Sequence, residues 1–90
     1  MFTNLEQLIK TIRKRKNSSL VQSYTSKLLN DKNLSLSKVK EEIGELIKAV
    51  EENSNKIHEA ADVIYHLMVY LESNEIKIED VMEELKKRQK

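Results

Sequence analysis

The chain has 90 residues, of which 34% are charged and 39% hydrophobic, and its net charge is +1. This length allows one domain, which we take as residues 1–90, and the near-zero charge argues against a dedicated nucleic-acid binder. The absence of cysteine excludes disulfides and thiolate metal sites. Neither a stretch of about 20 apolar residues nor the apolar core of a signal peptide is present, so we expect a cytoplasmic protein without membrane partners.

The chain is predicted to be all-α, a small bundle of four to five helices, because it has no proline, one glycine and abundant Leu, Ile, Lys and Glu. The predicted helices cover residues 4–16, 20–30, 35–53, 56–73 and 78–87. Polar stretches at 17–19, 30–33 and 53–55 separate the first four of them.

The predicted helices differ in how much of their surface is apolar. The third is expected to bury one stripe, made of Val39, Ile43, Leu46, Ile47 and Val50. The fourth is apolar almost all round, which predicts a central helix buried on several sides. A lone chain of this length buries only about 60% of the surface that its unfolded form exposes. We therefore expect that dimerisation completes the core.

Two pairs of acids stand out against these stripes. Glu42 and Glu45 lie three residues apart beside the stripe of the third helix, and Glu59 and Asp62 repeat this spacing on the apolar fourth helix. Carboxylates that are close together in apolar surroundings repel one another and are costly to desolvate. No Lys or Arg follows Lys56 on the fourth helix. If the pairs face each other, the natural counter-charge is Mg²⁺, with Mn²⁺ as a substitute, because both accept oxygen ligands.

Other interpretations of these acids remain. A single E-x-x-E pair is usually a solvated helix face, so a non-enzymatic helical interaction module stays an alternative. A di-iron carboxylate bundle requires Glu-x-x-His on two helices. The residues three before His58 and His66 are Asn55 and Val63, so that motif is absent.

The strings KVKEEIGELIKA (38–49) and HEAADVIYHLMVYL (58–71) resemble the E-E-x-x-E and E-x-x-D signature of the MazG-like all-α nucleotide pyrophosphatases. Within that superfamily, Ser23-Tyr24-Thr25 and the pair Tyr65-His66 resemble the phosphoribosyl-ATP pyrophosphatase family. The similarity covers about residues 5–88. The chain departs from the family where Lys40 replaces a frequent glycine, and where 30–33 contains none.

The resemblance implies Mg²⁺-dependent hydrolysis of phosphoribosyl-ATP to phosphoribosyl-AMP and pyrophosphate, the second step of histidine biosynthesis, by a homodimer. The alternative within the superfamily is a pyrophosphatase of another nucleoside or deoxynucleoside triphosphate. The expected metal ligands are Glu42, Glu45, Glu59 and Asp62. Glu41, which points further outward, is expected either to help deprotonate the attacking water or to be merely solvated.

Substrate contacts are expected from Arg13, Ser23, Tyr24, Thr25 and Lys38. The segment 23–25 is assigned by the resemblance to the substrate side or an interface, whereas Lys38 fits a phosphate contact and an ion pair with Glu42 equally well. His66 is either a partner of the metal ligands or a core histidine, and His58 is expected at a helix edge without chemistry. Gly44 is expected to allow close approach of another helix or of the substrate.

Overall fold

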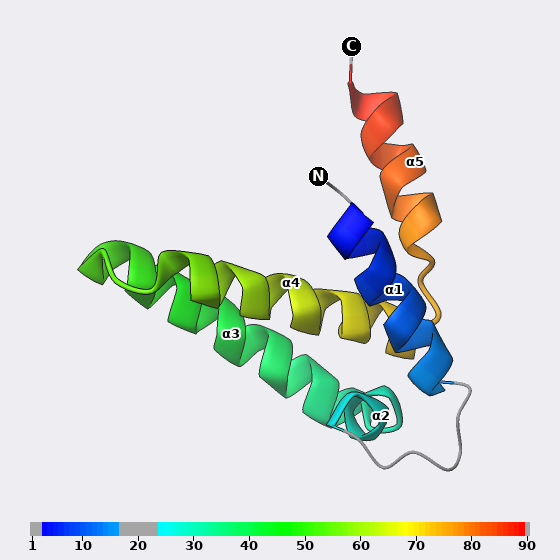
Figure 1. Ribbon diagram of the computed structural model, residues 1–90, viewed down its shortest axis with the longest axis horizontal. Helices are drawn as coiled ribbons and strands as arrows, with labels where there is room; N and C mark the ends of the chain where they lie inside the picture. Colours follow the sequence, from blue (N-terminus) through cyan, green and yellow to red (C-terminus); the bar gives the residue numbers. More distant parts are fainter. Residues whose placement is uncertain (1–2, 17–23, 90) are drawn as a thin grey trace.

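A computed structural model describes residues 3–16 and 24–89, and these residues form five α-helices and no strand (Figure 1). The helices are α1 (Thr3–Lys16), α2 (Tyr24–Leu29), α3 (Lys32–Glu52), α4 (Lys56–Ser73) and α5 (Ile78–Arg88). The predicted all-α class is confirmed. Helices α3 and α4 form a long antiparallel hairpin, and the other helices gather at the end of the hairpin away from its turn (Figure 1).

Most helix bounds agree with the prediction, and α4 has the predicted ends. Helix α3 begins three residues earlier than expected, because Asp31 caps it: its carboxylate accepts a hydrogen bond from the backbone N–H of Leu34 at 3.0 Å. The prediction of a break over 30–33 was therefore wrong in part, and only residues 30–31 connect α2 to α3. Residues 20–23 of the second predicted helix lie outside the described residues.

The turn between α3 and α4 depends on two asparagines. Asn53 and Asn55 both have left-handed backbone angles, with φ of 53° and 55°, a conformation that asparagine tolerates better than most residues. The backbone N–H of Ser54 returns to the carbonyl of Ala49 at 2.9 Å, which satisfies an orphan acceptor at the end of α3. This turn fixes the antiparallel return of α4 along α3.

Helix α4 is the centre of the bundle, as predicted, and contacts each of the other four described helices. The expected burial on several sides is wrong in part, because Ile57, Ile64 and Leu67 are exposed. Leu28 of α2 and Val69 of α4 are fully buried, and they pack with Ile12 of α1 in one cluster. The buried apolar residues among those described are Ile12, Leu28, Leu29, Val39, Ala49, Val69 and Ile78.

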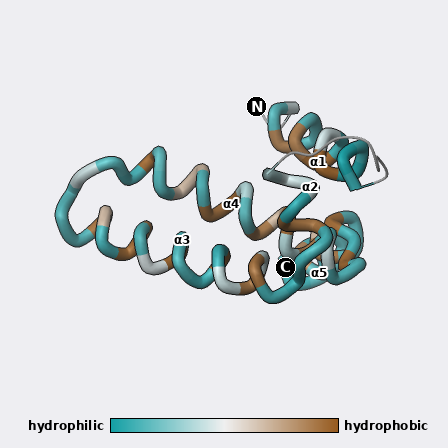
Figure 2. Tube along the Cα trace, turned by 90° about the horizontal axis from the view of Figure 1, so that it is seen from below, coloured by the Kyte–Doolittle hydropathy of each residue, from teal (hydrophilic) through white to brown (hydrophobic). Residues whose placement is uncertain are grey.

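The predicted burial of the α3 stripe is wrong for a single chain, except at Val39 and for the half-buried Leu46. Ile43, Ile47 and Val50 are 44%, 54% and 58% exposed. The physical reason is that, among the five described helices, α3 packs only on α4 and α2, so no described helix covers one side of its stripe. Figure 2 shows hydrophobic residues recurring along both helices of the hairpin. On α4 and α5 the exposed large apolar residues are Ile57, Ile64, Leu67, Met82 and Leu85.

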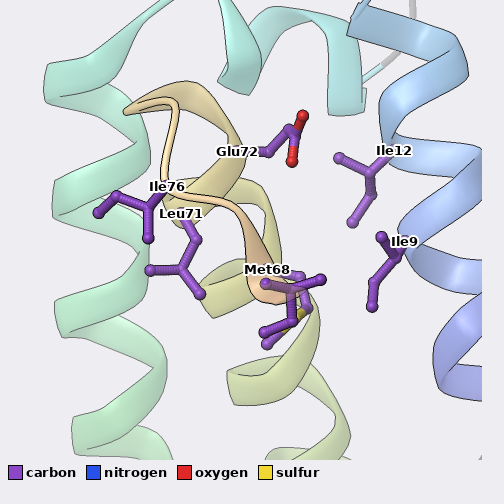
Figure 3. A pocket seen from close by; sticks show the side chains of 7 residues that line it. Ile9, Ile12, Met68, Leu71, Glu72 and Ile76 are labelled. Atoms are coloured by element: carbon purple, nitrogen blue, oxygen red, sulfur yellow. The ribbon is translucent and has the colours of Figure 1, made fainter. Parts of the chain in front are cut away.

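At the other end of the bundle, a small apolar pocket lies where α1 meets the end of α4 (Figure 3). Its one acid, Glu72, accepts a hydrogen bond from Arg13 at 3.5 Å and lies 3.8 Å from the ammonium of Lys16. The guanidinium of Arg13 also donates two hydrogen bonds to Glu79 of α5, at 2.8 and 2.6 Å. These bonds lower the pKa of Glu79 to about 2 and tie α5 to α1. In the part of the chain described, no helix is long and apolar enough to cross a membrane.

The core cluster predicts a large cost for truncation at Leu28. Leu28→Ala should destabilise the fold by about 2–5 kcal/mol in urea unfolding, because the side chain is fully buried and its removal leaves a cavity. The same substitution at Leu85, which is 46% exposed, is the matched control and should cost much less. Equal costs at the two positions would contradict the described core.

Candidate metal and active site

The α3–α4 hairpin brings the two predicted acid pairs together. Burial raises the pKa of Glu42 on α3, and the negative charges of Asp62 and Glu59 on α4 raise it further. Closer to the turn, Glu45 and Glu59 line the same surface hollow. Glu42, Glu59 and Asp62 are half-buried, whereas Glu45 is exposed. The four acids, called the acid cluster below, thus lie on facing parts of the two helices, and among the described residues Glu59 and Asp62 are the two of them whose ligand atoms lie within 4.8 Å of each other and of His58.

The acid cluster has no strong cationic partner in the described chain. Among residues 3–16 and 24–89, no Lys or Arg forms an ion pair with any of the four acids. The donors are hard oxygen atoms, and burial, followed by the negative charges of Asp62 and Glu59, raises the pKa of Glu42. A divalent ion that prefers oxygen fits this donor set, because it supplies the missing positive charge.

His58 joins this cluster, which the sequence interpretation missed. Its Nε2 atom lies 3.3 Å from Oδ2 of Asp62, one helical turn away. Ligand atoms of His58, Glu59 and Asp62 all lie within 4.8 Å of one another. The signal was present in the sequence as the i, i+4 spacing of His58 and Asp62, which places the two side chains on one face of α4.

Lys38 and Glu41 pair with each other beside the acid cluster. The ammonium of Lys38 lies 3.3 Å from a carboxylate oxygen of Glu41, three residues further along α3. The ion-pair partner of Lys38 is therefore Glu41 and not Glu42, which was the expected partner. Glu41 is exposed, as expected from its outward position. Hydrogen bonding to Glu41 raises the pKa of Lys38.

The two segments that carried the family resemblance meet in an aromatic cluster, here Tyr24, Thr25, Tyr65 and His66. The hydroxyls of Thr25 and Tyr65 are hydrogen-bonded at 2.5 Å, which ties α2 to α4. The ring of His66 is edge-on to both Tyr65 and Tyr24, with centroids 5.0 and 5.8 Å away. Burial lowers the pKa of His66 and raises that of Tyr24. The environment of His66 is thus that of a packed core histidine one turn from Asp62.

Three other expected residues have different surroundings. Arg13 is paired with Glu79 and Glu72 at the opposite end of α4, about 15 Å along the helix from Asp62 at 1.5 Å per residue. Ser23 lies outside the described residues. A Cβ atom placed on Gly44 would meet nothing within 4 Å, so in the described chain no helix approaches it closely.

The sequence matches the family described as phosphoribosyl-ATP pyrophosphohydrolase over residues 5–89, nearly the whole chain. The chain belongs to this family. Its activity, phosphoribosyl-ATP pyrophosphohydrolysis, is therefore the activity of this chain, and the prediction from the sequence is confirmed. Membership also removes the alternative of a non-enzymatic interaction module.

Named relatives agree with the family. A phosphoribosyl-ATP pyrophosphatase of Methanococcoides burtonii is 38% identical, over 93% of this chain and 90% of the relative. A phosphoribosyl-ATP pyrophosphatase of Bacillus cereus is 40% identical, over 90% of this chain and 78% of the relative. A chloroplastic histidine biosynthesis bifunctional protein of Arabidopsis thaliana is 44% identical over 96% of this chain, but the chain spans only 34% of that relative's length.

The repulsion within the acid cluster predicts that an amide at position 42 stabilises the metal-free protein. In EDTA near neutral pH, Glu42→Gln should raise the melting temperature by about 2–8 °C, the equivalent of roughly 0.5–1 kcal/mol of like-charge repulsion. Glu42 has a raised pKa in the folded state, so as pH falls the wild type takes up this proton before the unfolded chain does and gains stability. The difference between wild type and Glu42→Gln should therefore close as pH approaches 4.5.

Thermal unfolding followed by circular dichroism measures both effects. The control is Glu51→Gln, which removes an exposed charge from the same helix and should change the melting temperature little. Equal stabilisation by the two substitutions would mean that α3 responds only to its net charge.

Proposed function

We propose that this chain hydrolyses phosphoribosyl-ATP to phosphoribosyl-AMP and pyrophosphate with Mg²⁺ held by the acid cluster of Glu42, Glu45, Glu59 and Asp62. The observation that supports this proposal is that two acid pairs from α3 and α4 face each other while none of the four acids forms an ion pair with a lysine or arginine of the described residues. The reaction is a step of histidine biosynthesis, to which the names of relatives refer. A cytoplasmic location stays a prediction.

The acid cluster supplies positioning and electrostatics for this reaction. A bound Mg²⁺ neutralises charge on the departing pyrophosphate and lowers the pKa of a water molecule. The ion would be held by Glu59 and Asp62 on the central helix α4 and by Glu42 and Glu45 on α3. Its positive charge would in turn hold the phosphate end of the substrate. Because the ligands come from two packed helices rather than from loops, their separation is fixed before the substrate arrives.

Groups beside the acid cluster are assigned to the substrate. In this proposal the ammonium of Lys38 leaves its ion pair with the exposed Glu41 and binds a phosphate of the substrate instead. The carboxylate of Glu41 can then accept a proton from the attacking water. Tyr24 is 49% exposed and packs edge-on against His66 next to this region. The hydrogen bond between Thr25 and Tyr65 holds the start of α2 on α4. Arg13 remains a predicted substrate contact, although its guanidinium is committed to Glu79 and Glu72.

The chain is also proposed to be a homodimer. Ile43, Ile47 and Val50 recur at i, i+4 and i+7, so their exposed side chains lie on one face of α3. Ile57 of α4 is 88% exposed, and Gly44 has open space before it. A second copy would cover such a face and enlarge a core that is small for one chain.

The metal assignment predicts that Asp62→Asn abolishes turnover. Pyrophosphate release from phosphoribosyl-ATP should require Mg²⁺ and fall by about 100-fold or more in this variant, because one ligand charge is lost. The matched control is Asp80→Asn on exposed α5, which should keep full activity. A panel of ordinary nucleoside triphosphates should show little release. Full activity of Asp62→Asn would remove the acid cluster from the mechanism.

The proposed homodimer predicts the mass of the protein in solution. Sedimentation equilibrium at micromolar concentration should give twice the chain mass for the wild type, and Ile47→Asp should shift the protein to the monomer, because it places a charge in the apolar contact. The control is Lys40→Asp at an exposed polar position of the same helix. A stable wild-type monomer at this concentration would contradict the dimer.

A further inference from the structure

In the described chain, His58 is the histidine whose ring nitrogen lies within 4.8 Å of ligand atoms of Glu59 and Asp62, and the proposed reaction leaves it without a role. It lies in the first turn of α4, and its side chain is 72% exposed. Its ring is therefore held by no core packing. Asp62 is its ion-pair partner among the described residues, at 3.3 Å between Nε2 and Oδ2.

We propose that His58 is an additional ligand of the metal held by the acid cluster, so that the site binds Co²⁺ more tightly, relative to Mg²⁺, than carboxylates alone would. This inference rests on the proposed function, since it concerns the same metal site. In this proposal His58 adds one nitrogen donor to the four carboxylates, on the side of the acid cluster that is formed by α4.

The geometry suits shared coordination. Two ligand atoms that lie at right angles about one ion, each at about 2.1 Å, are about 3 Å apart. The observed 3.3 Å between His58 Nε2 and Asp62 Oδ2 needs only a small side-chain adjustment to meet this distance. Glu59 completes the set, because ligand atoms of all three residues lie within 4.8 Å of one another.

The chemistry of imidazole makes the proposal specific. A neutral imidazole adds a donor atom without adding a fifth negative charge to a cluster whose carboxylates already repel one another. Nitrogen donors suit Co²⁺ and Zn²⁺, whereas Mg²⁺ prefers oxygen and keeps its water ligands. His58 therefore affects the choice of ion more than the total affinity for Mg²⁺.

A plain surface pair is the competing explanation. An exposed i, i+4 pair such as His58 and Asp62 contributes a few tenths of a kcal/mol to a helix and needs no metal. It predicts that replacement of His58 leaves the preference between ions unchanged, so the two explanations are separated by metal binding rather than by stability.

The test is metal binding by full-length wild type and His58→Gln, which keeps a polar side chain at an exposed position. Co²⁺ binding is followed by its visible absorption and Mg²⁺ binding by calorimetry, and Mn²⁺-loaded protein is probed by pulsed electron paramagnetic resonance for coupling to imidazole nitrogen. We expect His58→Gln to bind Co²⁺ about tenfold more weakly, with Mg²⁺ affinity changed less than about threefold. We also expect the nitrogen coupling to disappear, although His66 is still present.

Two controls make the result decisive. Lys56→Gln, an exposed change in the same turn, should leave the ratio of Co²⁺ to Mg²⁺ affinity unchanged, and Asp62→Asn should weaken both ions. An unchanged ratio in His58→Gln, or nitrogen coupling that persists in it, would overturn the role of His58 while leaving the carboxylate site intact. Wild-type protein that binds none of the three ions would overturn the metal assignment itself.

Discussion

The antiparallel packing of α3 on α4 is the constraint on which the candidate site depends. Glu42 and Glu59 are 17 positions apart in the sequence, and only the return of the chain at Asn53 and Asn55 brings their charges into mutual range. Helices α1 and α2, which flank the hairpin, contribute to the core rather than to the acid cluster. Helices α1 and α2 bury one side of α4 around Val69, which leaves the α3 side of α4 for the acids.

Sequence reasoning succeeded where the physics is local. The spacing of the acid pairs, the polar break at 53–55 and both ends of α4 follow from helix periodicity and from the side chains that end helices. The start of α3 was missed, although its signal is local too. Asp31 is an N-cap, because its carboxylate accepts a hydrogen bond from the backbone N–H of Leu34 in the first turn of α3. The polar residues around Asp31 were instead interpreted as a loop.

The remaining differences come from long-range contacts. Nothing near Arg13 in the sequence indicates that its partner is Glu79, 66 positions away, because that pairing exists only once α1, α4 and α5 are assembled. Likewise, periodicity shows that Ile47 belongs to an apolar stripe, but not whether the stripe is covered by this chain or by another. The hydrogen bond between Thr25 and Tyr65 belongs to the same class.

The acid cluster and the exposed apolar face together make the stability of this fold conditional on what it binds. Native domains are stable by only about 5–15 kcal/mol, and repulsion within the acid cluster would subtract from that stability. An ion present at 100 times its dissociation constant adds about 2.7 kcal/mol, because it binds only the folded state. That term would be a substantial part of the intrinsic stability, and coverage of Ile43, Ile47 and Val50 by a second copy, as proposed above, would add a further contribution of the same sign. The acids and the exposed apolar residues of the hairpin are thus the side chains that, under the proposals above, would gain their partners from outside the chain, the acids from an ion and the apolar residues from a second copy.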